Sequence, residues 1–184
     1  MKIKRLFDFF FSFIILILIT WFLIFCFIIA TIETKSFGIF FQTRIGQFGK
    51  PFIIIKLKTI RSNSNKVTFS GKFFRKYKID ELPQFFNVLL GNMSIVGPRP
   101  DVKGYYDTLK GEERNILSLK PGITSMASIK YKNEEKLLAS QENSLKYNDE
   151  VIFPDKVKMN LEYYYKQSLF LDIKVIVRTI KSLV

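Results

Sequence analysis

Two neighbouring carboxylates, Asp80 and Glu81, are the side chains of this 184-residue sequence best suited to chemistry. They stand at the start of an amphipathic helix predicted over residues 81–90, where the helix dipole is expected to keep Asp80 ionised. An ionised carboxylate can attack phosphorus or bind a metal ion, and Mg²⁺ is the cation that neighbouring carboxylates without histidine favour. Acidic residues at a helix start also serve as plain capping groups, so the pair alone leaves both interpretations open.

A conformationally restricted arginine follows the acid pair. Arg99 lies between two prolines in the sequence Gly-Pro-Arg-Pro at residues 97–100. Because proline fixes φ, the guanidinium is presented from a stiff corner, and arginine can bind a phosphate through two hydrogen bonds at once. A proline-rich connector with a surface arginine is the alternative. Taken together, the two motifs indicate phosphoryl chemistry.

The elements that position these residues are predicted from spacing. Four apolar residues fall on one face of the predicted helix, namely Leu82, Phe85, Phe86 and Leu89. Gly91 suits the C-terminal end of that helix. A β-hairpin is predicted over residues 38–59, with its turn at 48–51. Residues 61–70 are polar and form either a connector or a mobile lid.

The N-terminal segment predicts a membrane anchor. Residues 9–32 contain no charged side chain and are long enough to cross a bilayer as a helix. Lysines and arginines flank both ends, so the positive-inside rule leaves a spanning and a re-entrant helix open. Thr20 can bend the helix by bonding to the carbonyl four residues earlier. Asp8 either pairs with Arg5 or ties the anchor to the rest of the chain.

The charge of the chain restricts its partners. The formal net charge is +13 without histidine, and Cys26 is the single cysteine, which excludes an internal disulfide and a Cys/His metal site. A soluble protein this basic would suggest nucleic acid, but no nucleic-acid-binding motif is recognisable. An anchored protein this basic suggests anionic phospholipid instead. We therefore predict a phospholipid membrane, and no nucleic acid, as a partner.

Two further segments combine cations with apolar residues. Residues 72–78 interleave lysine and arginine with aromatic rings, which is typical of a segment at a membrane surface or of a phosphate-binding route to Asp80. Residues 168–184 predict an amphipathic helix with an apolar stripe and a basic stripe. That helix lies in a bilayer interface or packs on the core, and the sequence does not choose between these.

Several blocks of the chain resemble the bacterial sugar transferases, which are small monotopic phosphoglycosyl transferases. The blocks are Lys-Arg-Leu-Phe-Asp at residues 4–8, Asp-Glu-Leu-Pro-Gln at 80–84, Met-Ser-Ile-Val-Gly-Pro-Arg-Pro at 93–100 and Lys-Pro-Gly-Ile-Thr at 120–124. The resemblance implies an α/β fold: a small membrane-associated domain with an N-terminal re-entrant membrane helix, a short β-hairpin and interfacial amphipathic helices. It divides the chain into an anchor at residues 1–33 and a cytoplasmic catalytic domain at residues 34–184.

The resemblance also implies a reaction at the cytoplasmic face of the bacterial inner membrane. Asp80 would attack the β-phosphate of a UDP-sugar, release UMP and form a covalent phosphosugar intermediate. Polyprenyl phosphate, in bacteria undecaprenyl phosphate, would then take up the sugar phosphate as the first membrane step of glycan synthesis. Glu81 would assist, and Mg²⁺ would be held by Asp80. Phosphate-binding residues would be Arg99, Lys56, Lys58 and Arg75.

The chain departs from the family pattern at three places, one of which is the only partly kept Asp-Leu-Tyr-Tyr block at residues 160–163. Thr20 and Trp21 stand where the family commonly has a Ser-Pro pair, and Ser125 and Ser128 stand where it commonly has glycine and glutamine. A catalytically impaired relative that serves as a membrane scaffold or substrate-binding subunit is therefore the alternative function. The sequence does not name the sugar, the pathway or the oligomeric state.

Overall fold

The computed structural model describes residues 2–183 and divides into two compact units. The first unit comprises Met1–Arg44 and Pro51–Ser94, and the second comprises Ile45–Lys50 and Ile95–Val184. Met1 and Val184, the outer ends of the two segments predicted from the sequence, lie outside the described residues. Each unit has its own core, so each is described separately.

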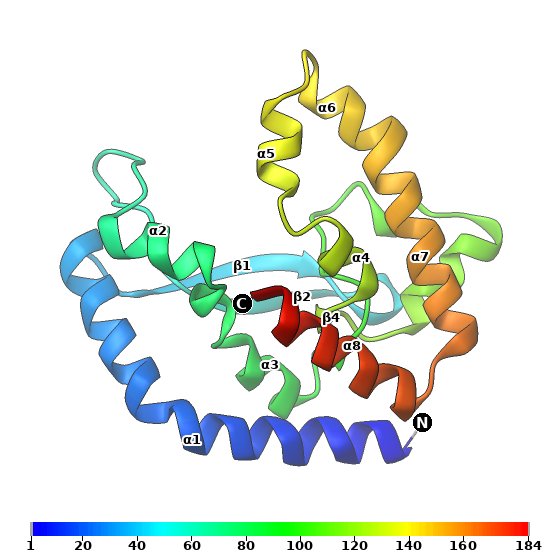
Figure 1. Ribbon diagram of the computed structural model, residues 1–184, viewed down its shortest axis with the longest axis horizontal. Helices are drawn as coiled ribbons and strands as arrows, with labels where there is room; N and C mark the ends of the chain where they lie inside the picture. Colours follow the sequence, from blue (N-terminus) through cyan, green and yellow to red (C-terminus); the bar gives the residue numbers. More distant parts are fainter. Residues whose placement is uncertain (1, 184) are drawn as a thin grey trace. The chain divides into compact units, whose positions relative to one another are not determined.

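The first unit contains a long helix, a hairpin and two short helices (Figure 1). Its elements are α1 (Lys2–Thr34), β1 (Ile39–Ile45), β2 (Pro51–Leu57), α2 (Phe69–Lys76), the 3-10 turn η2 (Ile79–Glu81) and α3 (Gln84–Leu90). Strands β1 and β2 pair as a two-stranded sheet, which confirms the predicted hairpin. Residues 61–68 link the hairpin to α2, and the Thr68 hydroxyl caps that helix by accepting a hydrogen bond from the Gly71 N–H.

Helix α1 is one continuous helix that is long and apolar enough to cross a membrane. Its buried side chains follow one stripe, which contains Asp8, Ser12, Leu16, Leu23, Cys26, Ala30 and Thr34. Most other apolar side chains of α1 are exposed, and Trp21 is 83% exposed. A helix that is apolar all round but packs on protein along one stripe leaves the rest of its surface suited to lipid.

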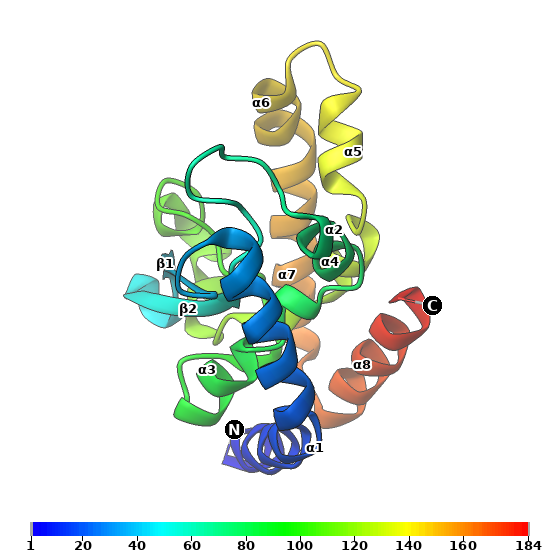
Figure 2. The same cartoon turned by 90° about the vertical axis from the view of Figure 1, so that its left-hand side faces the viewer.

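Helix α1 bends near its middle, as both views show (Figures 1 and 2). The Thr20 hydroxyl donates a hydrogen bond to the carbonyl oxygen of Leu16, which is the back-bond that the sequence predicts. A hydroxyl that competes for a helix carbonyl is a recognised cause of bending, and α1 contains no proline that could cause it instead.

The core of the first unit joins α1 to the hairpin and α2. Cys26 and Ala30 of α1 pack with Leu57 of β2 and Phe74 of α2. Cys26 is 1% exposed, so its thiol serves as a small apolar group in this core. The same helix that carries the lipid-suited surface therefore also fixes the strand and helix that flank Asp80.

Polar contacts hold the N-terminal part of α1 on α3. The Arg5 guanidinium donates to the carbonyl oxygens of Val88 and Leu89 at 2.5 and 2.7 Å, at the C-terminal end of α3 where cations are favoured. Asp8 is 2% exposed and accepts a hydrogen bond from the Ser94 hydroxyl at 2.8 Å. Of the two interpretations of Asp8, the structure supports the one that ties the anchor to the rest of the chain.

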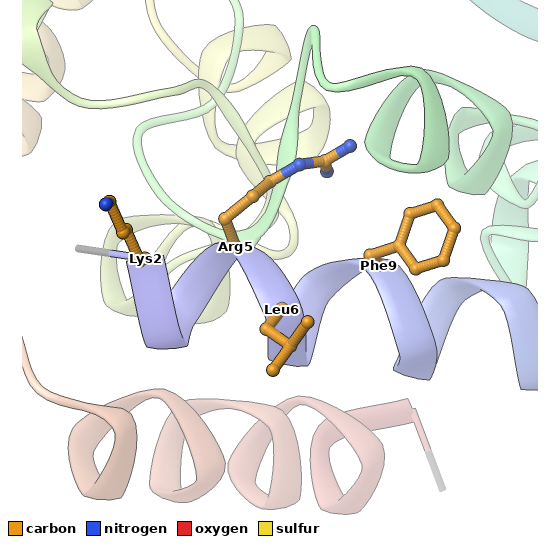
Figure 3. A pocket seen from close by; sticks show the side chains of 4 residues that line it. All are labelled: Lys2, Arg5, Leu6 and Phe9. Carbon is orange, nitrogen blue, oxygen red and sulfur yellow. The ribbon is translucent and has the colours of Figure 1, made fainter.

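A shallow hollow lies beside this contact and is lined by Lys2, Arg5, Leu6 and Phe9 (Figure 3). Arg5 reaches across from α1 toward α3, and its guanidinium carbon lies 5.9 Å from the centre of the Phe9 ring. The hollow contains none of the predicted site residues. Of its two cations, Arg5 is committed to the carbonyl oxygens of α3, so this side of the hollow belongs to the attachment of the helix.

Alanine substitutions at two buried serines of this attachment are expected to change the free energy of unfolding differently. Ser94→Ala removes a donor from the buried Asp8 carboxylate and is expected to cost about 1–3 kcal/mol of unfolding free energy. Ser12 is 0% exposed, and its hydroxyl has no hydrogen-bond partner in the described part of the chain. Ser12→Ala is therefore expected to be neutral or stabilising. Thermal unfolding in detergent checks both, and equal losses for the two variants would contradict this account.

The second unit is mostly helical around a second two-stranded sheet. Its strands are β3 (Ser94–Val96) and β4 (Gly122–Thr124). Its α-helices are α4 (Met126–Lys130), α5 (Glu134–Ala139), α6 (Ser144–Tyr147), α7 (Phe153–Lys166) and α8 (Leu169–Leu183). Its 3-10 segments are η1 (Gln47–Gly49), η3 (Tyr106–Thr108) and η4 (Gly111–Ser118). A π-helical segment, η5 (Asn148–Ile152), precedes α7. Its core contains Tyr106, Leu109, Ile116, Leu117 and Val157.

A buried polar pair ties α7 and α8 to the start of the Arg99 segment. The Tyr163 hydroxyl of α7 lies 2.5 Å from a carboxylate oxygen of Asp172 in α8 and 3.3 Å from the carbonyl oxygen of Val96 in β3. Asp172 is completely buried. Because β3 leads directly into residues 97–100, this pair fixes the strand from which Arg99 is presented.

Helix α8 leaves its predicted apolar stripe largely uncovered. Asp172 and Val175 are its buried residues, whereas four apolar residues of the stripe are exposed, namely Phe170, Ile173, Val177 and Ile180. The cations Lys174, Arg178 and Lys181 are exposed as well. The stripe therefore does not pack in the core of its unit, which favours the interpretation as an interfacial helix.

The mixed helix and sheet composition, the long apolar N-terminal helix and the small sheets confirm the coarse α/β prediction.

Candidate active site

Asp80 and Glu81 lie in the short turn η2, not in the helix that follows it. The predicted start of the helix at residue 81 is therefore wrong, since α3 begins at Gln84. Pro83 has no N–H to donate to the Ile79 carbonyl, and the N–H groups of Phe85 and Phe86 bond three residues back, to the carbonyls of Leu82 and Pro83. The Ile79 carbonyl instead accepts from the N–H of Leu82 at 3.2 Å, three residues on, which gives a 3-10 turn.

Asp80 is poorly solvated. Its Oδ1 atom is buried and has no hydrogen-bond partner within the described range. Burial, followed by the negative charge of Glu81, raises the pKa of Asp80 to about 6, against the opposing positive charges of Lys56, Lys78 and Arg75. We expected a helix start to keep Asp80 ionised. A pKa of about 6 still leaves Asp80 mostly ionised at neutral pH, but burial raises this pKa where a helix start would lower it.

Glu81 is also buried, but it has a cation beside it. Lys56 of β2 donates from Nζ to Glu81 Oε1 at 3.3 Å, and Glu81 is only 7% exposed. The ammonium compensates a carboxylate that is almost removed from water. The hairpin therefore supplies the charge that allows two adjacent acidic residues to be buried together.

The other two cations that were predicted to bind phosphate in the first unit, Arg75 and Lys58, make different contacts. Arg75 of α2 donates from Nε to the Thr59 hydroxyl at 2.9 Å, and its charge acts on Asp80. Lys58 donates instead to the hydroxyls of Ser36 and Ser62 at 2.8 and 2.7 Å. Within the described residues no hydrogen bond of Lys58 goes to either carboxylate of the pair.

Lys78 is a candidate site residue beyond those selected from the sequence. It adopts a left-handed conformation with φ of 56°, and its positive charge acts on Asp80. Only its position two residues before Asp80 and its place in a basic run signal this role in the sequence. The cations that act on Asp80 thus come from β2, from α2 and from the turn itself.

Asn87 positions the hairpin against α3 and was not selected as a site residue either. It is 1% exposed, accepts from the Ile55 N–H at 3.0 Å and donates to the Ile53 carbonyl at 2.7 Å. These bonds fix the register of β2, and therefore of Lys56, relative to the helix that follows Glu81. An amide inside an otherwise apolar helical segment is the signal that could have identified it.

The predicted apolar face of α3 is only half-buried: Leu82, Phe85 and Leu89 are partly covered, and Phe86 is 44% exposed. The buried residues of α3 are instead Gln84, Asn87 and Val88, and Leu90, outside the predicted face, is 71% exposed. The polar side chains face inward because they bond to β2, which leaves apolar side chains outside. An outward apolar face next to the acid pair is compatible with lipid contact.

The described residues contain no group of three or more His, Cys, Asp or Glu side chains placed to hold a metal ion. The unpartnered Asp80 Oδ1 nevertheless supplies one hard oxygen donor. Mg²⁺ is commonly held by one or two carboxylates, water and substrate phosphate oxygens. The residues therefore fit an ion that is bound together with a phosphate substrate rather than in a preformed protein site.

Arg99 belongs to the second unit and follows a tight backbone crossing. The Gly97 N–H donates to the Thr124 carbonyl at 3.0 Å, and the Gly122 N–H donates to the Pro98 carbonyl at 2.8 Å. A Cβ built on Gly122 would lie 2.1 Å from the Gly97 nitrogen. These contacts and the flanking prolines agree with the predicted stiff presentation of Arg99.

Gly122→Ala is expected to lower the free energy of unfolding by about 1–3 kcal/mol, because a methyl group there meets the Gly97 backbone, which cannot rotate away. Thermal unfolding measures the loss. Lys103→Ala, which changes an exposed residue of the same unit, serves as the control. An unfolding temperature for Gly122→Ala equal to that of the control would show that the crossing adapts.

The two serines that depart from the family pattern form a helix cap. The Ser125 hydroxyl accepts from the Ser128 N–H at 3.0 Å and lies 2.9 Å from the Ser128 hydroxyl at the start of α4. The departure therefore has a local structural role.

Comparisons with known proteins identify relatives of the whole sequence. Residues 1–184 match the family described as bacterial sugar transferase. The chain is 37% identical to a Klebsiella pneumoniae protein named UDP-glucose:undecaprenyl-phosphate glucose-1-phosphate transferase, over 98% of this chain and 40% of that protein. It is 33% identical to the galactosyl transferase CpsE of Streptococcus agalactiae, over 78% of this chain and 34% of that protein.

A third relative is similar in length to this chain. The sugar transferase EpsL of Bacillus subtilis is 29% identical over 99% of this chain and 87% of that protein. The chain thus spans well under half of the first two relatives and most of the third. These matches confirm the family that the sequence motifs indicated.

Proposed function

Since the chain belongs to the bacterial sugar transferase family, we propose that it transfers a sugar-1-phosphate from a UDP-sugar to polyprenyl phosphate and releases UMP. In bacteria the acceptor would be undecaprenyl phosphate, which the name of the Klebsiella relative contains. The observation that supports this most is the buried, unpartnered Oδ1 atom of Asp80 within reach of three positive charges. The product would be the first lipid-linked intermediate of a glycan.

In the first step Asp80 attacks the β-phosphorus of the UDP-sugar. An O–P bond forms to the carboxylate, and the bond to the α-phosphate oxygen breaks with release of UMP. A pKa near 6 leaves most Asp80 carboxylates ionised at neutral pH while making the oxygen more basic than an ordinary aspartate oxygen. Lys56, Lys78 and Arg75 stabilise the negative charge that the phosphates bring to the turn.

In the second step a phosphate oxygen of polyprenyl phosphate attacks the phosphorus of the aspartyl intermediate and releases the Asp80 carboxylate. Glu81, held by Lys56, is proposed to orient or deprotonate the incoming lipid phosphate. Arg99 and Lys58 are proposed as further phosphate-binding residues. When bound, Mg²⁺ would neutralise phosphate charge beside Asp80 Oδ1.

We further propose that residues 1–33 anchor a catalytic domain of residues 34–184 to the cytoplasmic face of the bacterial inner membrane. The exposed apolar surface of α1, the outward apolar residues of α3 and the uncovered stripe of α8 support lipid contact. The bend in α1 and the cations at both of its ends support a re-entrant rather than a spanning path.

The path is testable with single cysteines introduced as Lys2→Cys and Lys35→Cys in a Cys26→Ser background. A re-entrant helix leaves both thiols open to an impermeant reagent on the cytoplasmic side of the membrane. A spanning helix leaves only one of them open from that side.

The reaction is tested by UMP release from a panel of UDP-sugars with Mg²⁺ and undecaprenyl phosphate. We expect release that depends on one sugar and on the lipid. Absence of release from every sugar by a folded, membrane-bound protein would contradict the proposal and favour the catalytically impaired relative.

A further inference from the structure

Helix α2 carries a row of exposed aromatic rings, which we call the α2 ridge. Phe69, Phe73 and Tyr77 are spaced four residues apart, so they lie along one side of the helix. They are 88%, 54% and 40% exposed, and the rings of Phe73 and Tyr77 lie 4.7 Å apart between centres. Contiguous exposed apolar surface of this kind marks a site of contact with a ligand, a membrane or another protein, whereas apolar residues scattered singly need no explanation.

Cations flank the α2 ridge. Lys72 and Lys76 are exposed on the same helix, and Lys76 Nζ lies 5.0 Å from the centre of the Tyr77 ring. Beyond Tyr77 the chain passes through Lys78 into the turn that holds Asp80. The apolar row therefore ends, along the chain, at the positive charges that act on Asp80.

The opposite face of α2 is fixed to the rest of its unit. Phe74 is 4% exposed within the core, and a Cβ on Gly71 would meet the Thr59 carbonyl oxygen at 2.7 Å. The Arg75 side chain is held by Thr59 as well. Because α2 packs this closely, the ridge is a fixed outer face of the helix and its rings cannot turn inward.

We propose that the α2 ridge binds the prenyl chain of the polyprenyl phosphate acceptor and directs its phosphate toward Lys78, Arg75 and Asp80. This inference rests on the proposed function and adds a binding site to it. The ligand is an apolar chain with one anionic end, and the ridge is an apolar row with a cationic end, so shape and charge are complementary.

The surrounding bilayer is the other occupant to consider. Helix α1 already presents a long apolar surface that is far larger than three rings, so anchoring does not need the ridge. Lipid contact alone also does not explain why the aromatic row leads to the acid pair. We therefore assign the ridge to the acceptor chain.

The test combines Phe69→Ala with Phe73→Ala, two exposed residues outside the carboxylate pair. Phe41→Ala, which removes a 56% exposed ring from β1 in the same unit, is the control. We expect the double variant to raise the KM for undecaprenyl phosphate about tenfold or more, because aromatic contacts to the chain are lost. The KM for a water-soluble prenyl phosphate of two isoprene units should change less than twofold, and flotation with anionic phospholipid vesicles should be unchanged.

Two results would overturn the assignment. An unchanged KM for undecaprenyl phosphate would show that the chain binds elsewhere. Reduced vesicle flotation with equal losses for both acceptors would assign the ridge to the bilayer.

Photo-crosslinking separates this inference from the proposed reaction. A polyprenyl phosphate that carries a diazirine in its chain should label residues 69–77 of the wild type and label the double variant much less. If the wild type releases no UMP but this labelling is seen, the reaction fails while the binding site stands. If UMP is released and labelling of residues 69–77 is absent, the reaction stands and the ridge assignment fails.

Discussion

Asp80→Asn is expected to reduce UMP release at least about 1,000-fold while leaving the protein as stable as the wild type, or more stable, at neutral pH. The loss of activity follows if Asp80 is the nucleophile, since an amide cannot form the phosphoryl intermediate. The gain in stability follows from the burial of a carboxylate whose Oδ1 atom has no hydrogen-bond partner in the described residues.

The pH dependence of this effect has a definite sign. The folded-state pKa of Asp80, about 6, lies above the unfolded value of 3.8, so the folded protein binds more protons between these values. Stability from this residue is therefore greatest below about pH 4 and is lost as the pH rises through 6. The penalty at neutral pH is on the order of 2 kcal/mol, once the partial exposure of Asp80 is allowed for.

The measurement is thermal unfolding of wild type and Asp80→Asn from pH 4 to 8, together with UMP release at pH 7.5. The two unfolding temperatures should diverge as the pH rises, with the variant higher at pH 8. Glu142→Gln, which changes an exposed residue of the second unit, should show no such divergence. A variant that is less stable than wild type at pH 8 would mean that Asp80 has a stabilising partner.

The sequence predicts the local backbone structure around the site better than it predicts which distant residues pack against the site. The hairpin, the back-bond of Thr20 and the glycine end of α3 follow from spacing and backbone chemistry, and they are confirmed. The 3-10 turn at Asp80 could have been predicted as well, because Pro83 removes a known donor. These features depend on residues within one turn of each other.

The features that the sequence does not predict depend on distant residues. The pKa of Asp80 is set by burial and by cations from β2 and α2, which adjacency in the chain does not reveal. The outward face of α3 is a second case, because periodicity identifies an apolar face but not whether protein or lipid covers it. In this protein the two hydrogen bonds between Asn87 and β2 hold the polar face of α3 inward, which leaves apolar side chains on the outside.

Lys56→Met is expected to have the second large effect, on stability and on activity together. Lys56 donates to the buried Glu81 carboxylate at 3.3 Å, and its charge lowers the pKa of Asp80. Removing the ammonium takes away part of the compensation of a carboxylate that is almost removed from water, and breaking a buried pair in this way typically costs about 3–5 kcal/mol. We expect the low end of that range, because the Lys56 side chain is 17% exposed.

Loss of the Lys56 charge also raises the pKa of Asp80 further. The fraction of ionised Asp80 at neutral pH therefore falls, and the acidic limb of the pH–activity profile is expected to move to higher pH. Activity at pH 7 should drop about 100-fold and recover in part at pH 8.5. Lys66→Met is the control, because it removes an exposed lysine of the same unit that is not among the cations acting on Asp80.

A double variant separates the two roles of Lys56. Adding Glu81→Gln to Lys56→Met removes the buried carboxylate charge that Lys56 compensated, so the unfolding temperature should return toward that of the wild type while activity stays low. If the double variant stays as unstable as Lys56→Met, the ammonium supports the fold through contacts other than Glu81. If it regains activity, phosphate binding does not require the Lys56 charge, and the cations that serve the reaction are those of α2 and of the turn.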